Sequence, residues 1–122
     1  MKTKDEVMKR DENVAVEPQA KREVRVEPAA DVFRDAEGVR LLVDLPGVAE
    51  DGLNVQLHDG VLKIEGKAER GAGVTRLYQR AFRVDRRIDA EAIQAKVRQG
   101  VLTLRLPFRA EAQPRRIQVL AE

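Results

Sequence analysis

The sequence predicts an all-β protein in which two antiparallel sheets pack face to face. Apolar residues alternate with polar residues over several short runs, which is typical of strands that bury one face. Two turn-forming pairs, Asp59-Gly60 and Gln99-Gly100, separate neighbouring runs. Aromatic residues make up 3% of the 122 residues, so the core has to be built from Val, Leu and Ile, which suit a pleated surface.

The strands of the first half follow from this alternation. Alternate apolar residues cover 39–45, and Pro46-Gly47 ends that run. The same spacing covers 53–57 and resumes over 62–64 beyond Asp59-Gly60, which is the usual signal of a β-hairpin. We therefore expect three strands here, two of them joined as a hairpin.

The second half contains three more expected strands. A strand over 77–84 is followed by a polar connection over 85–91. The pair Gln99-Gly100 then joins strands over 93–97 and 101–106 in a second hairpin. Together, the short strands and their turns predict an immunoglobulin-like antiparallel β-sandwich.

One stretch has two interpretations. Asp89–Val97 also fits a helix, because Ala90 and Ile93 would lie on one helix face. We prefer a strand, because Gly100 followed by a clear strand indicates a hairpin, while a single helical turn over Asp89–Ala92 stays open. Helical and strand patterns do not alternate along the chain, which excludes a parallel α/β sheet.

The chain divides into one domain and two tails. Residues 1–27 are highly charged and contain few apolar residues, so we expect a mobile N-terminal arm, with a short strand at Arg22–Val26 as the alternative. Pro28 marks a shift in composition, and the domain extends from residue 28 to residue 108. Residues 109–122 form a short C-terminal extension.

The net charge of +2 is unevenly distributed. Residues 1–30 have no net charge, residues 31–75 carry −4 and residues 76–122 carry +6. A basic half can indicate nucleic-acid binding, but such modules place aromatic residues among the cations to stack bases. Here Tyr78 and Phe82 alternate onto the face assigned to the core. We therefore expect a solvated basic face and no nucleic-acid partner.

Few residues are available for catalysis or metal binding. The sequence has no Cys and no Ser, and its one His is His58, which excludes a disulfide, a Cys or Ser nucleophile and a His-rich zinc site. No glycine-rich segment has the spacing that cradles phosphate. We expect no catalytic residue, cofactor or metal, and hence no enzyme, although the scattered Asp and Glu residues leave an acid–base pair open. His58 is expected to be exposed at a strand end, with pH sensing as the alternative.

The apolar runs are only a few residues long, which is too short to cross a membrane. The N-terminus shows no apolar signal segment. We expect a soluble cytoplasmic protein without a membrane partner.

Arg80 stands apart from the other basic residues, because it shares a strand face with Tyr78 and Phe82. A charge on a buried face is costly unless it is paired. Either this face is not wholly buried, or Arg80 meets a carboxylate, for example across a subunit interface. The alternative is a side chain that reaches the sheet edge.

The C-terminal tail carries two apolar residues, Ile117 and Val119, two positions apart, so an extended tail directs both to one side. We expect them to enter a groove between two edge strands. The groove, for the tail or for a bound protein, is predicted to consist of Val55, Leu57, Ile93, Ala95 and Val97.

Five segments carry a family resemblance. The most specific is AKVRQGVL at 95–102. The others are VDLPGV at 43–48, DGVLKIEG at 59–66, YQRAFRV at 78–84 and IQV at 117–119. In this order they resemble the small heat-shock protein, or alpha-crystallin, family, over roughly Pro28 to Val119.

The resemblance implies an alpha-crystallin domain acting in the stress response as an ATP-independent chaperone, a holdase that binds non-native client proteins and limits their aggregation. A chaperone-like binding or scaffold module with little aggregation suppression is the alternative. The resemblance also implies self-association as a dimer or small oligomer, with Arg80, Tyr78 and Phe82 at the dimer interface. The polar arm predicts modest, client-restricted activity and small assemblies, because the family's aromatic arm residues are missing.

The chain departs from the family in one connection. Bacterial members usually carry, between the strands placed here at 62–67 and 77–84, a small strand exchanged between partners. Only Ala68–Thr75 is available, which is too short to reach out, pair and return. We therefore expect a dimer that pairs the Arg80 strand edge to edge.

Overall fold

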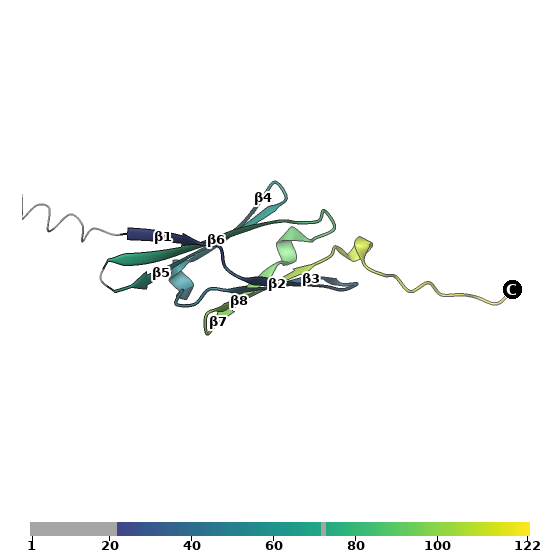
Figure 1. Ribbon diagram of the computed structural model, residues 1–122. Coiled ribbons are helices and arrows are strands. Elements are labelled where there is room, and N and C mark those ends of the chain that lie inside the picture. The colour runs from purple at the N-terminus through teal and green to yellow at the C-terminus, as the bar shows by residue number, and fades with distance from the viewer. Residues whose placement is uncertain (1–21, 72) are drawn as a thin grey trace, which may run out of the picture.

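The computed structural model describes residues 22–71 and 73–122, and it confirms the all-β fold (Figure 1). One four-stranded sheet has the order β1-β6-β5-β4, with β1 at Arg22–Val26, β6 at Val74–Arg83, β5 at Val61–Arg70 and β4 at Leu53–His58. The other has the order β2-β3-β8-β7, with β2 at Ala30–Arg34, β3 at Gly38–Asp44, β8 at Val101–Pro107 and β7 at Gln94–Arg98. Short 3-10 helices lie in the connections: η2 at Glu50–Gly52, η3 at Ala90–Ala92 and η4 at Ala110–Ala112.

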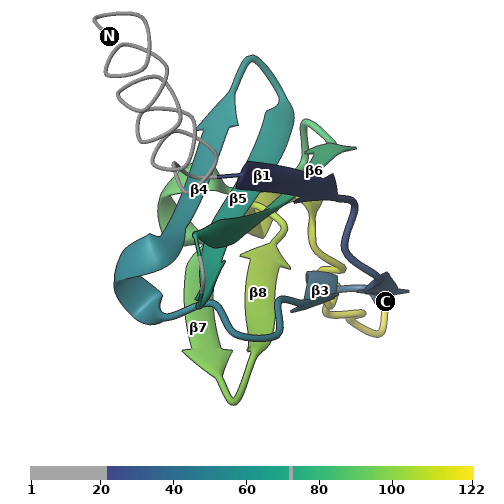
Figure 2. The same ribbon diagram turned by 60° about the vertical axis from the view of Figure 1, so that its left-hand side comes forward.

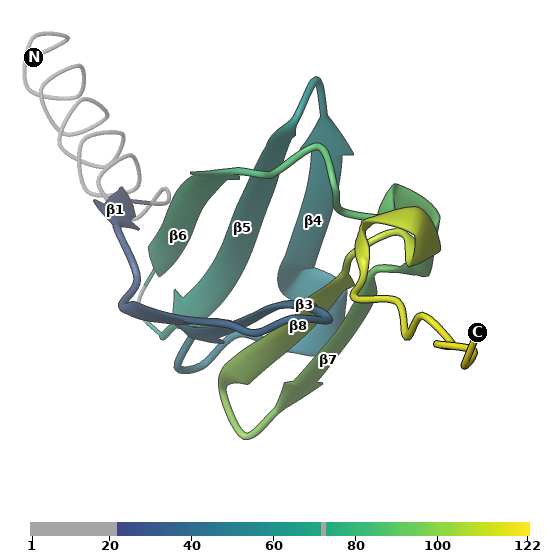
Figure 3. The same cartoon turned by 90° about the vertical axis from the view of Figure 1, so that its right-hand side faces the viewer.

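The two sheets are stacked so that the sandwich has two different open sides. Figures 2 and 3 show the edge strands β4 and β7 on one side, and β6 with β1 opposite β2 on the other. We call these the β4/β7 side and the β2/β6 side.

Within the described part of the chain, no helix is long and apolar enough to cross a membrane.

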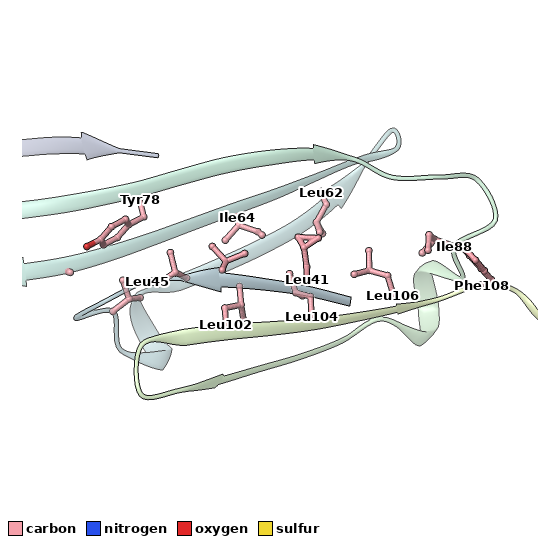
Figure 4. Close-up of a cluster of buried hydrophobic side chains, with 13 residues drawn as sticks. Leu41, Leu45, Leu62, Ile64, Tyr78, Ile88, Leu102, Leu104, Leu106 and Phe108 are labelled. Carbon is pink, nitrogen blue, oxygen red and sulfur yellow. The ribbon is translucent and has the colours of Figure 1, made fainter. Parts of the chain in front are cut away.

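The core lies between the sheets, where the alternating apolar residues meet (Figure 4). Leu41 and Val43 of β3 lie opposite Leu104 and Leu102 of β8. Ile64 faces them from the other sheet. The largest fully buried side chains of the core are Leu45, Leu62, Ile64, Leu102, Leu104 and Val43. A shift of any strand by one residue would expose this set, so the register follows from the alternation.

Both predicted hairpins are present, because their turn residues adopt the required backbone. Asp59 and Gly60 have φ values of 50° and 74°, and Gln99 and Gly100 have 49° and 77°. Two consecutive residues with positive φ match the twist of the flanking strands in a tight hairpin. The first turn joins β4 to β5 and the second joins β7 to β8.

One pair of strands is parallel, against the expectation of purely antiparallel sheets. β1 runs alongside β6 from Arg22 opposite Val74 to Val26 opposite Tyr78. The chain leaves β1 toward β2 in the other sheet, so no hairpin fixes the direction of β1. The strand considered at Arg22–Val26 is therefore real, and residues 22–27 of the expected arm belong to the folded part. The rest of that arm lies outside the described residues.

Two further details were not in the sequence-based prediction. The sequence predicts no strand at β2, which pairs with β3. The strands β5 and β6 extend their ladder to Arg70 opposite Val74, so the connection shrinks from Ala68–Thr75 to residues 71–73. The region before β7 combines both interpretations: η3 is a single helical turn capped by the Asp89 side chain, and the strand follows it.

Candidate interaction surfaces

The β4/β7 side brings the predicted groove residues to two neighbouring strand edges. Val55 and Leu57 lie on β4, opposite Ile64 and Leu62 of β5, so their side chains face the space between the sheets. On the other edge, β7 places Ala95 opposite Leu104 and Val97 opposite Leu102. Ile93 lies just before β7, at the end of η3.

These side chains are incompletely covered. Val55, Leu57, Ile93 and Val97 are half-buried and pack against the core, and Ala95 is exposed. Among the described residues, no side-chain hydrogen bond or ion pair joins β4 to β7. This side therefore presents apolar surface beside unpaired strand edges, a combination that favours binding of an extended chain.

Within one chain, the C-terminal tail does not lie on the β4/β7 side. Residues 114–122 form no helix or strand, and Figure 1 shows them leading away from the sandwich. Ile117 is 82% exposed and Val119 is 88% exposed. Leu120, which the sequence reasoning did not select, is 77% exposed. Residues 22–71 and 73–122 thus leave both the apolar edges and the apolar tail uncovered.

Arg80 finds its polar partners within its own chain. Its Nη1 donates a hydrogen bond to the carbonyl oxygen of Pro28 at 2.8 Å, and its Nε lies 3.8 Å from Glu27. The guanidinium also lies 5.0 Å from the centre of the Phe82 ring. The side chain is 31% exposed. Arg80 therefore tethers the segment between β1 and β2, which answers the question of how its charge is paired.

The edge of β6 is partly covered by β1. Because β1 pairs with Val74–Tyr78, the stretch from Gln79 to Arg83 pairs with β5 on one edge and has no neighbouring strand on the other edge among the described residues. Tyr78 is buried, and its hydroxyl lies 3.3 Å from the carbonyl oxygen of Pro46. Of the predicted dimer residues, Tyr78 thus contributes its side chain to the core, whereas Arg80 and Phe82 stay partly exposed.

The β2/β6 side contains a cavity that the sequence reasoning missed. It has a volume of about 230 Å³. It is lined mainly by apolar side chains from both sheets and from the loop after β6. The apolar lining residues include Val32, Leu41, Leu62, Phe82, Val84, Ile88 and Leu106, and the charged lining residues are Arg34, Arg83 and Asp85.

The rim of this cavity carries a charge cluster. Asp85 accepts a hydrogen bond from Arg87 Nη2 at 2.8 Å and meets Arg34 Nη2 at 3.4 Å. The side-chain hydrogen bonds from Arg87, with a further one from its backbone N–H, lower the pKa of Asp85 to about 2. The ion pair between Arg34 and Asp85 links β2 to the loop that follows β6.

His58 lies where the sequence placed it, exposed at the end of β4 and 3.3 Å from Asp59. Within residues 22–71 and 73–122, no group of three or more His, Asp or Glu side chains is arranged to hold a metal ion.

Comparisons with known proteins agree on one family. The Hsp20/alpha crystallin family model matches residues 31–120. The chain is 37% identical over 103 residues to spore protein SP21 of Stigmatella aurantiaca, covering 75% of this chain and 61% of that protein's length. It is 36% identical over 107 residues to a probable 15 kDa heat shock protein of Leptospira interrogans, covering 80% of this chain and 82% of that one.

Solved structures share the fold. A small heat-shock protein from Xylella fastidiosa superposes with a TM-score of 0.62 at 30% identity, covering 80% of this chain and 100% of that one. Heat shock protein 16.0 from Schizosaccharomyces pombe gives a TM-score of 0.65, covering 80% of this chain and 99% of that one; at 24% identity this similarity concerns the fold alone.

Proposed function

Because the chain belongs to the Hsp20/alpha crystallin family, we propose that it is an ATP-independent chaperone that binds non-native proteins and limits their aggregation under stress. Family membership supports a chaperone role in stress, in a family of generally non-enzymatic proteins. The observation that carries the proposal is the apolar β4/β7 side, which lies open while the apolar tail is also exposed. Binding the unfolded state withdraws it from aggregation by mass action, without an energy source. The proposed site of action is the cytoplasm.

In this proposal the tail holds chains together. Ile117 and Val119 of one chain enter the groove between β4 and β7 of a neighbouring chain, while Gln118 faces water. Burying two such side chains contributes about 3–5 kcal/mol before the cost of ordering the tail. The net contact is weak, which suits an assembly that exchanges subunits and exposes its grooves.

The proposed dimer uses the edge of β6. The connection between β5 and β6 is only residues 71–73, so it leaves no room for an exchanged strand. Two β6 strands are proposed to pair over Gln79–Arg83, the stretch that β1 leaves open. Arg80 supports this contact indirectly, by keeping Glu27 and Pro28 in place beside it.

A binding or scaffold module with little aggregation suppression is the second candidate. The specific observation in its favour is the N-terminal arm, whose residues 1–27 contain no aromatic residue and gain little from burial. The two candidates differ in one measurable property, which is suppression of client aggregation.

The test is light scattering of a heat-labile enzyme, with and without the full chain and without ATP. We expect scattering to fall in proportion to the amount of chain added. Unchanged scattering would support the scaffold function instead.

Native mass spectrometry of Ile117→Ala with Val119→Ala tests the tail, with Gln118→Ala as the matched control. We expect the double variant to lose the larger assemblies and the control to keep them. An unchanged distribution in the double variant would rule out the groove contact.

A further inference from the structure

The outer edge of β2 has no neighbouring strand among the described residues, because β2 ends its sheet. The backbone bonds from Asp35 to Gly38 and from Asp44 to Ala29 mark the odd-numbered residues as those bonded to β3. In an antiparallel ladder these alternate with residues whose N–H and C=O point outward. Ala30, Val32 and Arg34 therefore present their backbone groups to the free edge.

This edge is also apolar. Val32 is 58% exposed and Phe33 is 48% exposed. Val32 lies opposite the buried Leu41, so its side chain faces inward and forms one wall of the cavity on the β2/β6 side. A strand added to β2 would continue the sheet and place alternate side chains over that cavity. An exposed edge beside a pocket is the arrangement by which sheets bind extended peptides.

The cavity has the size of a side chain. Its volume of about 230 Å³ lies below the ~300–1,000 Å³ of small-molecule pockets but above the ~150 Å³ that holds benzene in an engineered cavity. Its walls include Leu62, Phe82 and Ile88, so the cavity suits an apolar group. One large aliphatic or aromatic side chain from an added strand would fill it.

The rim selects by charge. Arg34 and Asp85 line the cavity, and Asp85 is paired with both Arg34 and Arg87, so the three groups together carry one net positive charge. Successive side chains of an added strand point to opposite faces, so this charge favours a carboxylate two positions from the entering residue, on the same face. It disfavours the chain's own tail, because Arg115 and Arg116 immediately precede Ile117. A second copy pairing through β2 would bring a further Arg34 to the rim.

From these four features we infer that the β2 edge and its cavity form a binding site for an extended segment of a non-native polypeptide. The segment carries one large apolar residue with Asp or Glu two positions away from it. The inference rests on the proposed chaperone function and adds to it where a client binds and which segments are preferred.

The test uses two labelled peptides that differ only at the positions two residues before and two residues after a central Leu, one with Glu at both positions and one with Lys. Binding to the full chain is followed by fluorescence anisotropy. We expect the Glu peptide to bind about tenfold more tightly. Equal affinities, or tighter binding of the Lys peptide, would overturn the inference.

Variants then locate the site. Val32→Pro removes an outward N–H without adding charge, a change that an edge strand accommodates. Val32→Asp changes the cavity wall at an exposed position. We expect each variant to weaken the Glu peptide about tenfold, whereas Val24→Asp, at an exposed valine of the other edge strand β1, leaves binding unchanged. Circular dichroism verifies folding of each variant.

Two other results would contradict the site. If Ile117→Ala with Val119→Ala strengthens peptide binding, the tail is the occupant. If Val32→Asp changes only the oligomer size, a second copy is the occupant. Failure of the wild-type chain to suppress enzyme aggregation would instead contradict the proposed function, and peptide binding is measured independently of it.

Discussion

The two open sides of the sandwich differ in the contacts that connect their strands and loops. On the β2/β6 side, polar contacts cross between elements: Arg80 bonds to Pro28, and Arg34 meets Asp85. On the β4/β7 side, half-buried apolar side chains pack against the core, and no such link joins the two edges among the described residues. The first side is thus fixed around a preformed cavity, and the second is an open apolar edge.

The difference separates two tasks that a chaperone assembly has to perform. An apolar edge without fixed partners suits a contact that forms and breaks, as proposed for the tail. A cavity with a charged rim suits selection of one kind of segment. Because the two surfaces lie on opposite sides, a tail bound at the β4/β7 side leaves the β2 edge open, so the proposed tail contact and the proposed client binding need not compete.

Truncating an apolar side chain on each side gives the largest contrast in stability. Phe82→Ala enlarges the existing cavity and removes the ring beneath Arg80, so we expect a loss of about 3 kcal/mol in the free energy of unfolding. Leu57→Ala, at the open edge of β4, is expected to lose about 1.5 kcal/mol, because water reaches the vacated space. Urea denaturation of both variants measures the difference. A larger loss for Leu57→Ala would show that the β4/β7 side is the more tightly packed.

Removing the tether on the β2/β6 side has a smaller effect. Arg80→Ala deletes the hydrogen bond to Pro28 and the contact with Glu27, and we expect a loss of about 1–2 kcal/mol. Hydrogen exchange should quicken at Arg22–Val26, because β1 loses its anchor. Lys63→Ala, at an exposed outward-facing position of β5, serves as the control. Unchanged exchange in β1 would mean that its ladder with β6 holds it without Arg80.

The smallest effect concerns the charge at the rim. The pKa of Asp85 is about 2 in the folded chain against an ordinary value of 3.8, so its charge stabilises the fold above about pH 4. This contribution is lost as the pH falls toward 2. We expect Asp85→Asn to lower the Tm slightly at pH 7 and to match the wild type near pH 2. A Tm difference that is the same at both pH values would contradict the pairing of Asp85 with Arg87.

Much of the fold was predictable because its signals are local. The pairs at Asp59-Gly60 and Gln99-Gly100 demand a tight turn wherever they occur, and the alternation beside them fixes which residues are buried. The same alternation assigned the residues predicted to form the groove to β4, to β7 and to the position just before β7. The parallel direction of β1 was not predictable, since its partner β6 lies about fifty residues away and no turn connects them.

The cavity and the pairing of Arg80 were hidden for a different reason. The cavity depends on how far β2 lies from β6 in the other sheet, and no run of residues records that distance. Arg80 was correctly singled out as a charge on an inward face, but its partners come from Glu27 and Pro28, in a segment that had been assigned to the arm and its boundary.

By itself, then, the sequence determined six of the eight described strands, the two tight turns, the buried face of these strands and the family, because residue spacing and turn chemistry act over a few residues. Only the tertiary structure decided which strand edges are covered, where the sheets leave a cavity and which groups pair with Arg80 and Asp85. These properties depend on contacts between elements that lie far apart in the chain. The free energies of such contacts depend on the packed molecule and cannot be inferred from any single segment.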